Sequence, residues 1–245
     1  MRLLVSVVDE AEAREAAAGG ADIVDVKDPT AGALGMPTPR SLRNVRLAVA
    51  RDVPISAALG DGPFEPAEAA RRAAAAVVCG AAFVKIGLRD TSPGRATEIV
   101  RAVRRRVRGT VHVIAAGFAD WSRAGSPDPL DLPALARAGG ASGCLIDTAV
   151  KDGRGLLSWM DRDALMSFVA ACRMRDMLCA MAGSLTAEDL PGFAAIAPDL
   201  VGVRGAACVG DRVSGRVSRA RVAVLVSALN SCRGAPAGHG LGTGY

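Results

Sequence analysis

Lysine is the scarce basic residue of this chain, because three lysines stand against 27 arginines among 245 residues. Aromatic residues make up only 3% of the chain, which leaves few side chains to stack on bases and argues against a nucleic-acid partner. The two histidines, His112 and His239, lack metal-ligand spacing, so we expect no metal site and no cofactor. No apolar run is long enough to cross a membrane.

Charge and cysteine usage point to an ordinary intracellular protein. The net charge of +5 is spread along the chain, apart from a dense arginine run at 104–108 that ends a helical stretch, where cations suit the helix dipole. The six cysteines show no C-x-x-C spacing, and several lie in apolar runs, as buried thiols of a reducing compartment do. The first residues turn acidic too early for a signal peptide. We therefore expect a soluble, cytoplasmic protein without a membrane partner.

Small aliphatic residues are abundant, and half of the chain is hydrophobic. Short apolar runs alternate with longer Ala-rich stretches of helical character. The predicted strands are 3–8, 22–27, 53–59, 83–87, 111–116, 143–147, 178–182 and 200–203. The predicted helices are 9–18, 38–50, 66–79, 93–107, 131–138, 161–174, 186–196 and 218–231.

This alternation predicts an α/β fold with a parallel sheet. Eight strand–helix units in a chain of this length match a single (β/α)8 TIM barrel over residues 1–232, followed by a flexible, Gly-rich C-terminal tail at 233–245. A doubly wound open sheet is the alternative, but no G-x-G-x-x-G follows the first strand.

The three lysines all follow even-numbered predicted strands. Lys27 ends the second strand, Lys85 lies near the end of the fourth, and Lys151 lies a few residues beyond the sixth. Active sites of such barrels lie at these strand ends. Codon bias in a GC-rich genome explains why lysine is rare. It does not explain why the three lysines all fall on one rim of the barrel, the rim formed by the carboxyl ends of the strands.

Two aspartates are predicted to share this rim. Asp25 and Lys27 are two residues apart on a strand and therefore face the same side, and Asp147 ends the sixth strand. Burial and neighbouring cations lower the pKa of a lysine, which then serves as an amine nucleophile or base. The alternative is a buried ion-pair network that only closes the top of the barrel.

A phosphate site is the second predicted feature, because the loops after the last two strands often bind phosphate in this fold. The predicted substrate-binding residues are Gly183, Ser184, Arg204, Gly205, Ala206 and Arg212. Small residues there also suit tight turns, which is the other interpretation. Arg216 is a further candidate for a second phosphate, and Trp121 and Trp159 are candidates to cover the site. Cys208 is interpreted as a small filler and not as a nucleophile.

Five segments resemble one known family. They read ADIVDVKDPTAGALG, FVKIGL, LIDTAVKDG, AGSL and VGVRGAACVGDR, and they are similar to the (5-formylfuran-3-yl)methyl phosphate synthases of methanofuran biosynthesis. The resemblance runs from Met1 to about Arg221. It implies a barrel that condenses two molecules of glyceraldehyde 3-phosphate to 4-(hydroxymethyl)-2-furancarboxaldehyde phosphate, with release of phosphate and water.

The resemblance also implies roles for the residues of the rim. The Schiff-base lysine of the family matches Lys27, and its proton-transferring lysine matches Lys85. Its other active-site residues match Asp25, Asp147 and Lys151. Two other functions stay open: another Schiff-base aldolase or lyase acting on a sugar phosphate, and a non-catalytic barrel that binds a phosphorylated metabolite. Apolar Ala-rich helices make a homo-oligomer the expectation.

Overall fold

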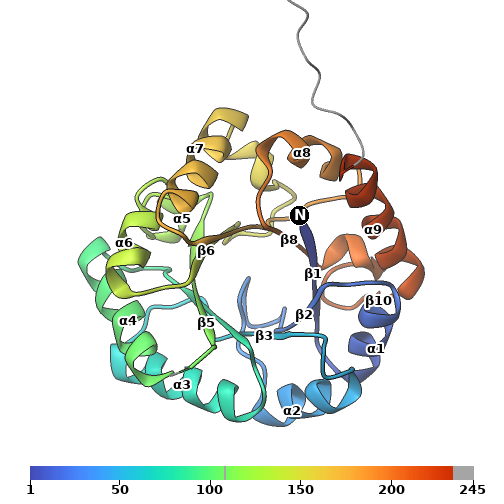
Figure 1. The fold of residues 1–245 in the computed structure, drawn as a ribbon, viewed down its shortest axis with the longest axis horizontal. Helices are drawn as coiled ribbons and strands as arrows, with labels where there is room; N and C mark the ends of the chain where they lie inside the picture. The colour runs from blue at the N-terminus through green and yellow to red at the C-terminus, as the bar shows by residue number, and fades with distance from the viewer. Residues whose placement is uncertain (108, 234–245) are drawn as a thin grey trace, which may run out of the picture.

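The computed structural model describes residues 1–107 and 109–233 and shows a closed parallel barrel surrounded by helices (Figure 1). Each strand of the barrel pairs with the next along the chain, and β1 pairs with β8 to close the ring. The barrel strands are β1 Arg2–Val7, β2 Ile23–Val26, β3 Ile55–Ala58, β4 Phe83–Gly87, β5 His112–Phe118, β6 Gly143–Asp147, β7 Leu178–Met181 and β8 Leu200–Val203. Closure confirms the predicted TIM barrel and excludes the open sheet.

Helices alternate with the strands and form the outer layer (Figure 1). The principal helices are α1 Glu10–Ala18, α2 Pro39–Ala48, α3 Pro66–Val78, α4 Pro93–Arg106, α6 Leu132–Gly139, α7 Arg162–Arg173 and α9 Arg219–Arg233. Short elements lie in the loops at the carboxyl side of the strands: α5 Trp121–Ala124, η1 Leu156–Ser158, η3 Gly205–Ala207 and the antiparallel pair β9 Cys208–Val209 and β10 Arg216–Val217. Among the described residues, no helix has the length and apolar character needed to span a membrane.

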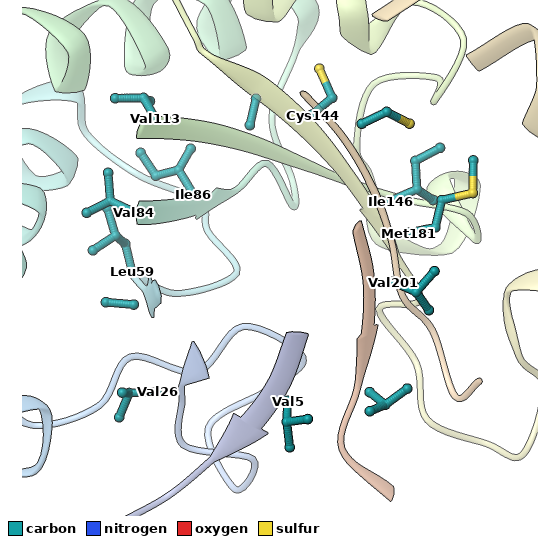
Figure 2. Close-up of a cluster of buried hydrophobic side chains, with 14 of the residues drawn as sticks. Val5, Val26, Leu59, Val84, Ile86, Val113, Cys144, Ile146, Met181 and Val201 are labelled. Carbon is teal, nitrogen blue, oxygen red and sulfur yellow. The ribbon is translucent and has the colours of Figure 1, made fainter. Parts of the chain in front are cut away.

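Strand periodicity divides the barrel side chains into two buried layers. One set points out of the ring and packs beneath the helices; Figure 2 shows Val5, Val84 and Ile146 among its members. The alternate residues, such as Leu4 and Leu145, fill the barrel interior. Toward the carboxyl ends of β1, β2, β4 and β6 the interior set becomes polar, with the buried residues Ser6, Asp25, Lys85 and Asp147. This change of character begins the functional site.

The predicted helix at 186–196 is the main error of the sequence analysis. The structure has a 3₁₀ turn, η2 Leu190–Gly192, followed by a single helical turn, α8 Phe193–Ile196. Pro191 lacks a backbone N–H and Gly192 disfavours helix, so a continuous helix does not form. The Asp189 side chain nevertheless accepts a hydrogen bond from the Thr186 backbone N–H at 2.8 Å, as in a capping box. Of the predicted tail, only Arg233 lies within the described residues, where α9 ends.

Candidate active site

The rim lysines and aspartates meet at the carboxyl ends of the strands. They surround a cavity of about 270 Å³, which Lys27, Lys85, Asp147 and Lys151 line. Asp25 lies in the barrel interior beside Lys85 and is fully buried. The structure therefore brings all five sequence-predicted residues together, on β2 and directly after it, on β4, at the end of β6 and in the loop after β6.

Asp25 lies in register between serines of both neighbouring strands, Ser6 on β1 and Ser56 on β3. Its Oδ2 accepts hydrogen bonds from Ser6 Oγ at 2.9 Å and from Lys85 Nζ at 2.6 Å. A buried carboxylate is costly unless it is paired and hydrogen-bonded, and this pair of contacts offsets that cost. The arrangement fixes the Lys85 ammonium inside the barrel, where its side chain is 6% exposed.

Asp147 and Lys151 form a second ion pair on the rim. Lys151 Nζ donates to Asp147 Oδ1 at 2.7 Å and to Thr148 Oγ1 at 2.8 Å. Burial raises the pKa of Asp147, but the positive charges of Lys151 and Lys27 outweigh that effect and lower it to about 2. The carboxylate is therefore ionised at neutral pH.

Among the residues that the structure describes, no carboxylate lies within hydrogen-bonding distance of Lys27, in contrast to the other two lysines. Its Nζ donates to the backbone carbonyl of Ala33 at 3.1 Å, and only 7% of the residue is exposed. Burial lowers the pKa of Lys27 to about 8; the charges of Asp147 and Asp25 raise it, and those of Lys85 and Lys151 lower it. A substantial fraction of this amine is therefore neutral, and nucleophilic, near physiological pH.

The loops after β7 and β8 line the same cavity. Gly183 and Ser184 follow β7, and Gly205, Ala206 and Arg212 follow β8. Gly183 has φ +119°, which glycine adopts readily and which lets the backbone turn tightly beside the cavity. The predicted phosphate-binding residues therefore come together on the side of the cavity formed by β7 and β8.

Arg204 also lines the cavity, but most of its guanidinium is used inside the protein. Its Nη1 contacts Glu12 Oε2 at 2.9 Å and the Ser6 carbonyl at 3.0 Å, and its Nε donates to the Arg212 carbonyl at 2.6 Å. The Nη2 atoms of Arg204 and Arg212 are buried and have no hydrogen-bond partner within the described part of the chain. Two such guanidinium nitrogens beside one cavity favour an anionic ligand.

The other sequence candidates lie elsewhere. Arg216 forms an ion pair with Asp9 at 2.7 Å and is absent from the cavity lining. The guanidiniums of Arg123 and Arg154 lie over the ring of Trp159, at 5.3 and 4.4 Å. Neither tryptophan lines the cavity. Burial raises the pKa of Cys208, which agrees with a filler and not a thiolate nucleophile.

Sequence reasoning missed Glu12, the buried partner of Arg204, and two aspartates that bind loops of the rim. Asp61 accepts hydrogen bonds from the backbone N–H groups of Ala33 and Leu34. Asp120 does the same for Ala149 and Val150, immediately before Lys151. The only sequence signal was their position, because each follows an odd-numbered strand at the functional end of the barrel.

Glu12→Ala is expected to lower the free energy of unfolding by about 3–5 kcal/mol, because it leaves the Arg204 guanidinium buried without its counter-charge. Both side chains of this pair are almost fully buried, at 3% and 1% exposed. Urea denaturation measures the change. Glu98→Ala is the matched control, since it breaks an exposed pair with Arg95 and should cost less than about 1 kcal/mol. Equal losses in the two variants would contradict the prediction.

The fold and the site define a class: a TIM barrel whose cavity is lined by a cluster of buried amines and carboxylates and by two arginines. The described residues contain no group of three or more His, Cys, Asp or Glu side chains that could hold a metal ion. The sequence profile of the family described as 4-HFC-P synthase matches residues 3–226, so the chain belongs to this family. The sequence resemblance is thereby confirmed.

Individual relatives agree with this assignment. The (5-formylfuran-3-yl)methyl phosphate synthase of Methanothermobacter thermautotrophicus is 43% identical over 235 residues, which cover 94% of this chain and all of the relative. The enzyme of the same name from Methanocaldococcus jannaschii is 40% identical over 230 residues, covering 92% and 98%. Both relatives are named as synthases, and both are matched over nearly their whole length. They indicate that this chain is an enzyme.

Solved structures support the barrel fold. The 3-hexulose-6-phosphate synthase of Salmonella typhimurium superimposes with a TM-score of 0.64 at 15% identity, covering 93% of this chain and 100% of the other. Phosphoribosyl anthranilate isomerase from Thermus thermophilus gives a TM-score of 0.63 at 18% identity, covering 94% and 99%. At these identities the likeness concerns the fold alone.

Proposed function

We propose that this enzyme condenses two molecules of glyceraldehyde 3-phosphate through a Schiff base at Lys27 and forms 4-(hydroxymethyl)-2-furancarboxaldehyde phosphate, a step of methanofuran biosynthesis. The observation that carries the proposal is the Lys27 amine, whose pKa burial lowers to about 8 and which lines a cavity beside a second buried lysine. The names of the relatives, which describe a formylfuran phosphate ester, agree with a furan product.

The residues around Lys27 suit this chemistry. The neutral amine attacks a triose carbonyl, and the adduct loses water to give an iminium. The iminium acidifies the adjacent carbon. In the proposed mechanism the neutral form of Lys85 takes that proton, and its contact with Asp25 keeps the side chain inside the barrel and stabilises the ammonium that results. Asp147 and Lys151 supply further acid–base groups for the aldol addition, ring closure and dehydration. Two trioses give the six carbons of the product, with one phosphate and two waters released.

The anionic substrates account for the other side of the cavity. Phosphate oxygens accept hydrogen bonds from guanidinium groups and from backbone N–H groups in Gly-rich turns. We assign one substrate phosphate to the loops after β7 and β8, with Gly183, Ser184, Gly205 and Ala206 supplying the turns and Arg204 and Arg212 the unpaired Nη2 atoms.

The direct test is incubation of the purified enzyme with glyceraldehyde 3-phosphate alone. The expected result is a new ultraviolet absorbance from the conjugated furan aldehyde, with release of inorganic phosphate in equal amount. A folded protein that binds the triose phosphate without producing a furan would reject this function. A different aldol product would favour another Schiff-base aldolase, and binding without any product would favour a non-catalytic sensor.

The pH dependence of imine formation should report the Lys27 amine. Because burial lowers the Lys27 pKa to about 8, the reactive neutral form increases as the pH rises through 8. The rate of borohydride trapping with triose phosphate, measured under single-turnover conditions, should therefore rise about tenfold per pH unit below 8 and level off above it. A profile that rises until pH 10 would contradict the lowered pKa.

A further inference from the structure

Asp61 lies just beyond β3, between the two strands that carry Lys27 and Lys85. Its backbone is fixed to the end of β4, because its carbonyl accepts a hydrogen bond from the Arg89 N–H at 2.9 Å. The approach is close: a Cβ atom added to Gly87 would lie 2.4 Å from that carbonyl oxygen. The position of Asp61 is therefore tied to the strand of Lys85.

The Asp61 side chain reaches in the opposite direction, to the loop after β2. Its Oδ1 accepts from the Leu34 N–H at 2.7 Å, and its Oδ2 accepts from the Ala33 N–H at 3.0 Å. Gly32 has φ +126°, and a Cβ atom there would lie 2.1 Å from Asp61 Oδ2. The loop can therefore approach the carboxylate this closely only with glycine at position 32.

The same loop supplies the contact of the Lys27 amine. The carbonyl of Ala33 accepts the hydrogen bond from Lys27 Nζ at 3.1 Å, while the N–H of Ala33 is held by Asp61. Ala33 and Leu34 are buried in the barrel interior, so their peptide groups have little freedom to move independently. One residue thus connects, through two short contacts, the strand of Lys85 to the amine of Lys27.

We propose that Asp61 is a positioning residue that fixes the Lys27 amine relative to Lys85. The inference rests on the proposed roles of the two lysines in imine formation and proton transfer. Catalysis that needs an amine and a base at one substrate depends on their separation, and a displacement of about 1 Å costs on the order of 100-fold in rate. A carboxylate suits this task because it accepts two N–H groups at once.

The first experiment measures the Lys27 amine without any substrate. Wild type, Asp61→Asn and Asp61→Ala are labelled briefly with acetic anhydride, and mass spectrometry quantifies acetylation of Lys27, Lys85 and Lys151. Without Asp61 the loop is no longer held, and the Ala33 carbonyl no longer offers the Lys27 ammonium a fixed acceptor. Lys27 should therefore be acetylated several-fold faster than in wild type. The increase should be larger in Asp61→Ala than in Asp61→Asn. Lys151 should stay within about twofold, because Asp147 and Thr148 hold it independently.

The second experiment measures catalysis of the same variants. The expected result is a fall in kcat of about 10- to 100-fold with little change in KM, because the phosphate-binding loops are untouched. Asp199→Asn is the matched control: Asp199 accepts the Cys179 N–H at 2.8 Å at the opposite end of the barrel and should leave both measurements unchanged. A thermal melt of each variant verifies the fold.

The outcomes separate the two proposals. Faster labelling of Lys27 alone, together with a lower kcat, supports the positioning role. Unchanged Lys27 labelling and unchanged turnover in folded Asp61→Ala would overturn it. Equally faster acetylation of all three lysines would also overturn it, because Asp61 would then only stabilise the fold. If wild type makes no furan, the proposed function fails, while the labelling result still decides whether Asp61 sets the Lys27 amine.

Discussion

Lys27→Ala is expected to reduce furan formation by roughly three orders of magnitude or more, because it removes the amine that forms the covalent intermediate. The substitution should also abolish borohydride trapping. The remaining site keeps its shape, since Lys27 donates a hydrogen bond to Ala33 and, among the described residues, has no direct carboxylate contact. Removing it therefore leaves both rim ion pairs, Lys85–Asp25 and Lys151–Asp147, with their partners.

Because lysine is rare in this chain, the test can assign the adduct to one of a few residues. After trapping with triose phosphate and proteolysis, the adduct can lie on only three side chains, or on the amino terminus. Wild type should carry it on Lys27, and Lys151→Ala should carry it there too. Restoration of turnover by a small primary amine in Lys27→Ala would identify the missing group as the amine itself. An adduct on Lys85 or Lys151 in wild type would instead move the nucleophile to another strand.

The barrel was predictable because its strands are short apolar runs that alternate with longer Ala-rich helical stretches. At 186–196 the pattern was misleading: the composition favours helix, but Pro191 and Gly192 divide the segment into a 3₁₀ turn and one helical turn. The alternation of strand side chains predicted that Asp25 and Lys27 face inward together, and the fold places both in the interior, with Lys27 on the cavity wall. Regular elements carry local signals that a single sequence displays.

The contacts that refine the site are long-range and were not predictable. Arg204 looked like a phosphate ligand from its position after β8, but its Nη1 pairs with Glu12, 192 residues away, which leaves only Nη2 unpaired. Asp61 holds Ala33 from a distance of 28 residues. No periodicity or motif links such residues, because a carboxylate that accepts backbone N–H groups requires no particular sequence in its partner.

The two buried lysines are also an example of why arginine does not replace lysine. Arg204 and Arg212 suit an anion, since a guanidinium stays protonated and presents several donors in one plane. Lys27 and Lys85 occupy positions where the proposed chemistry requires a nitrogen that releases or accepts a proton. Under the proposed mechanism, a chain that uses arginine almost everywhere keeps lysine at the two positions where a proton must be released or accepted.

Lys85→Arg is therefore expected to lower kcat by about 100- to 10,000-fold although it preserves the positive charge. The guanidinium can still pair with Asp25, so the ion pair that Lys85 makes at 2.6 Å retains its charges, but it cannot accept a proton from the substrate carbon. Imine formation at Lys27 should continue. The variant should thus trap with borohydride at Lys27 while it loses exchange of the substrate C–H proton with deuterated water.

This combination separates proton transfer from binding and from folding. Steady-state kinetics, trapping and deuterium exchange are measured on the same preparation. The matched control is Arg95→Lys on the exposed part of α4, which also replaces one of these two residue types by the other. Near-wild-type turnover of Lys85→Arg would remove Lys85 as the proton carrier. Loss of trapping together with turnover would show instead that Lys85 acts by placing charge beside Lys27, since its charge is among those that lower the Lys27 pKa.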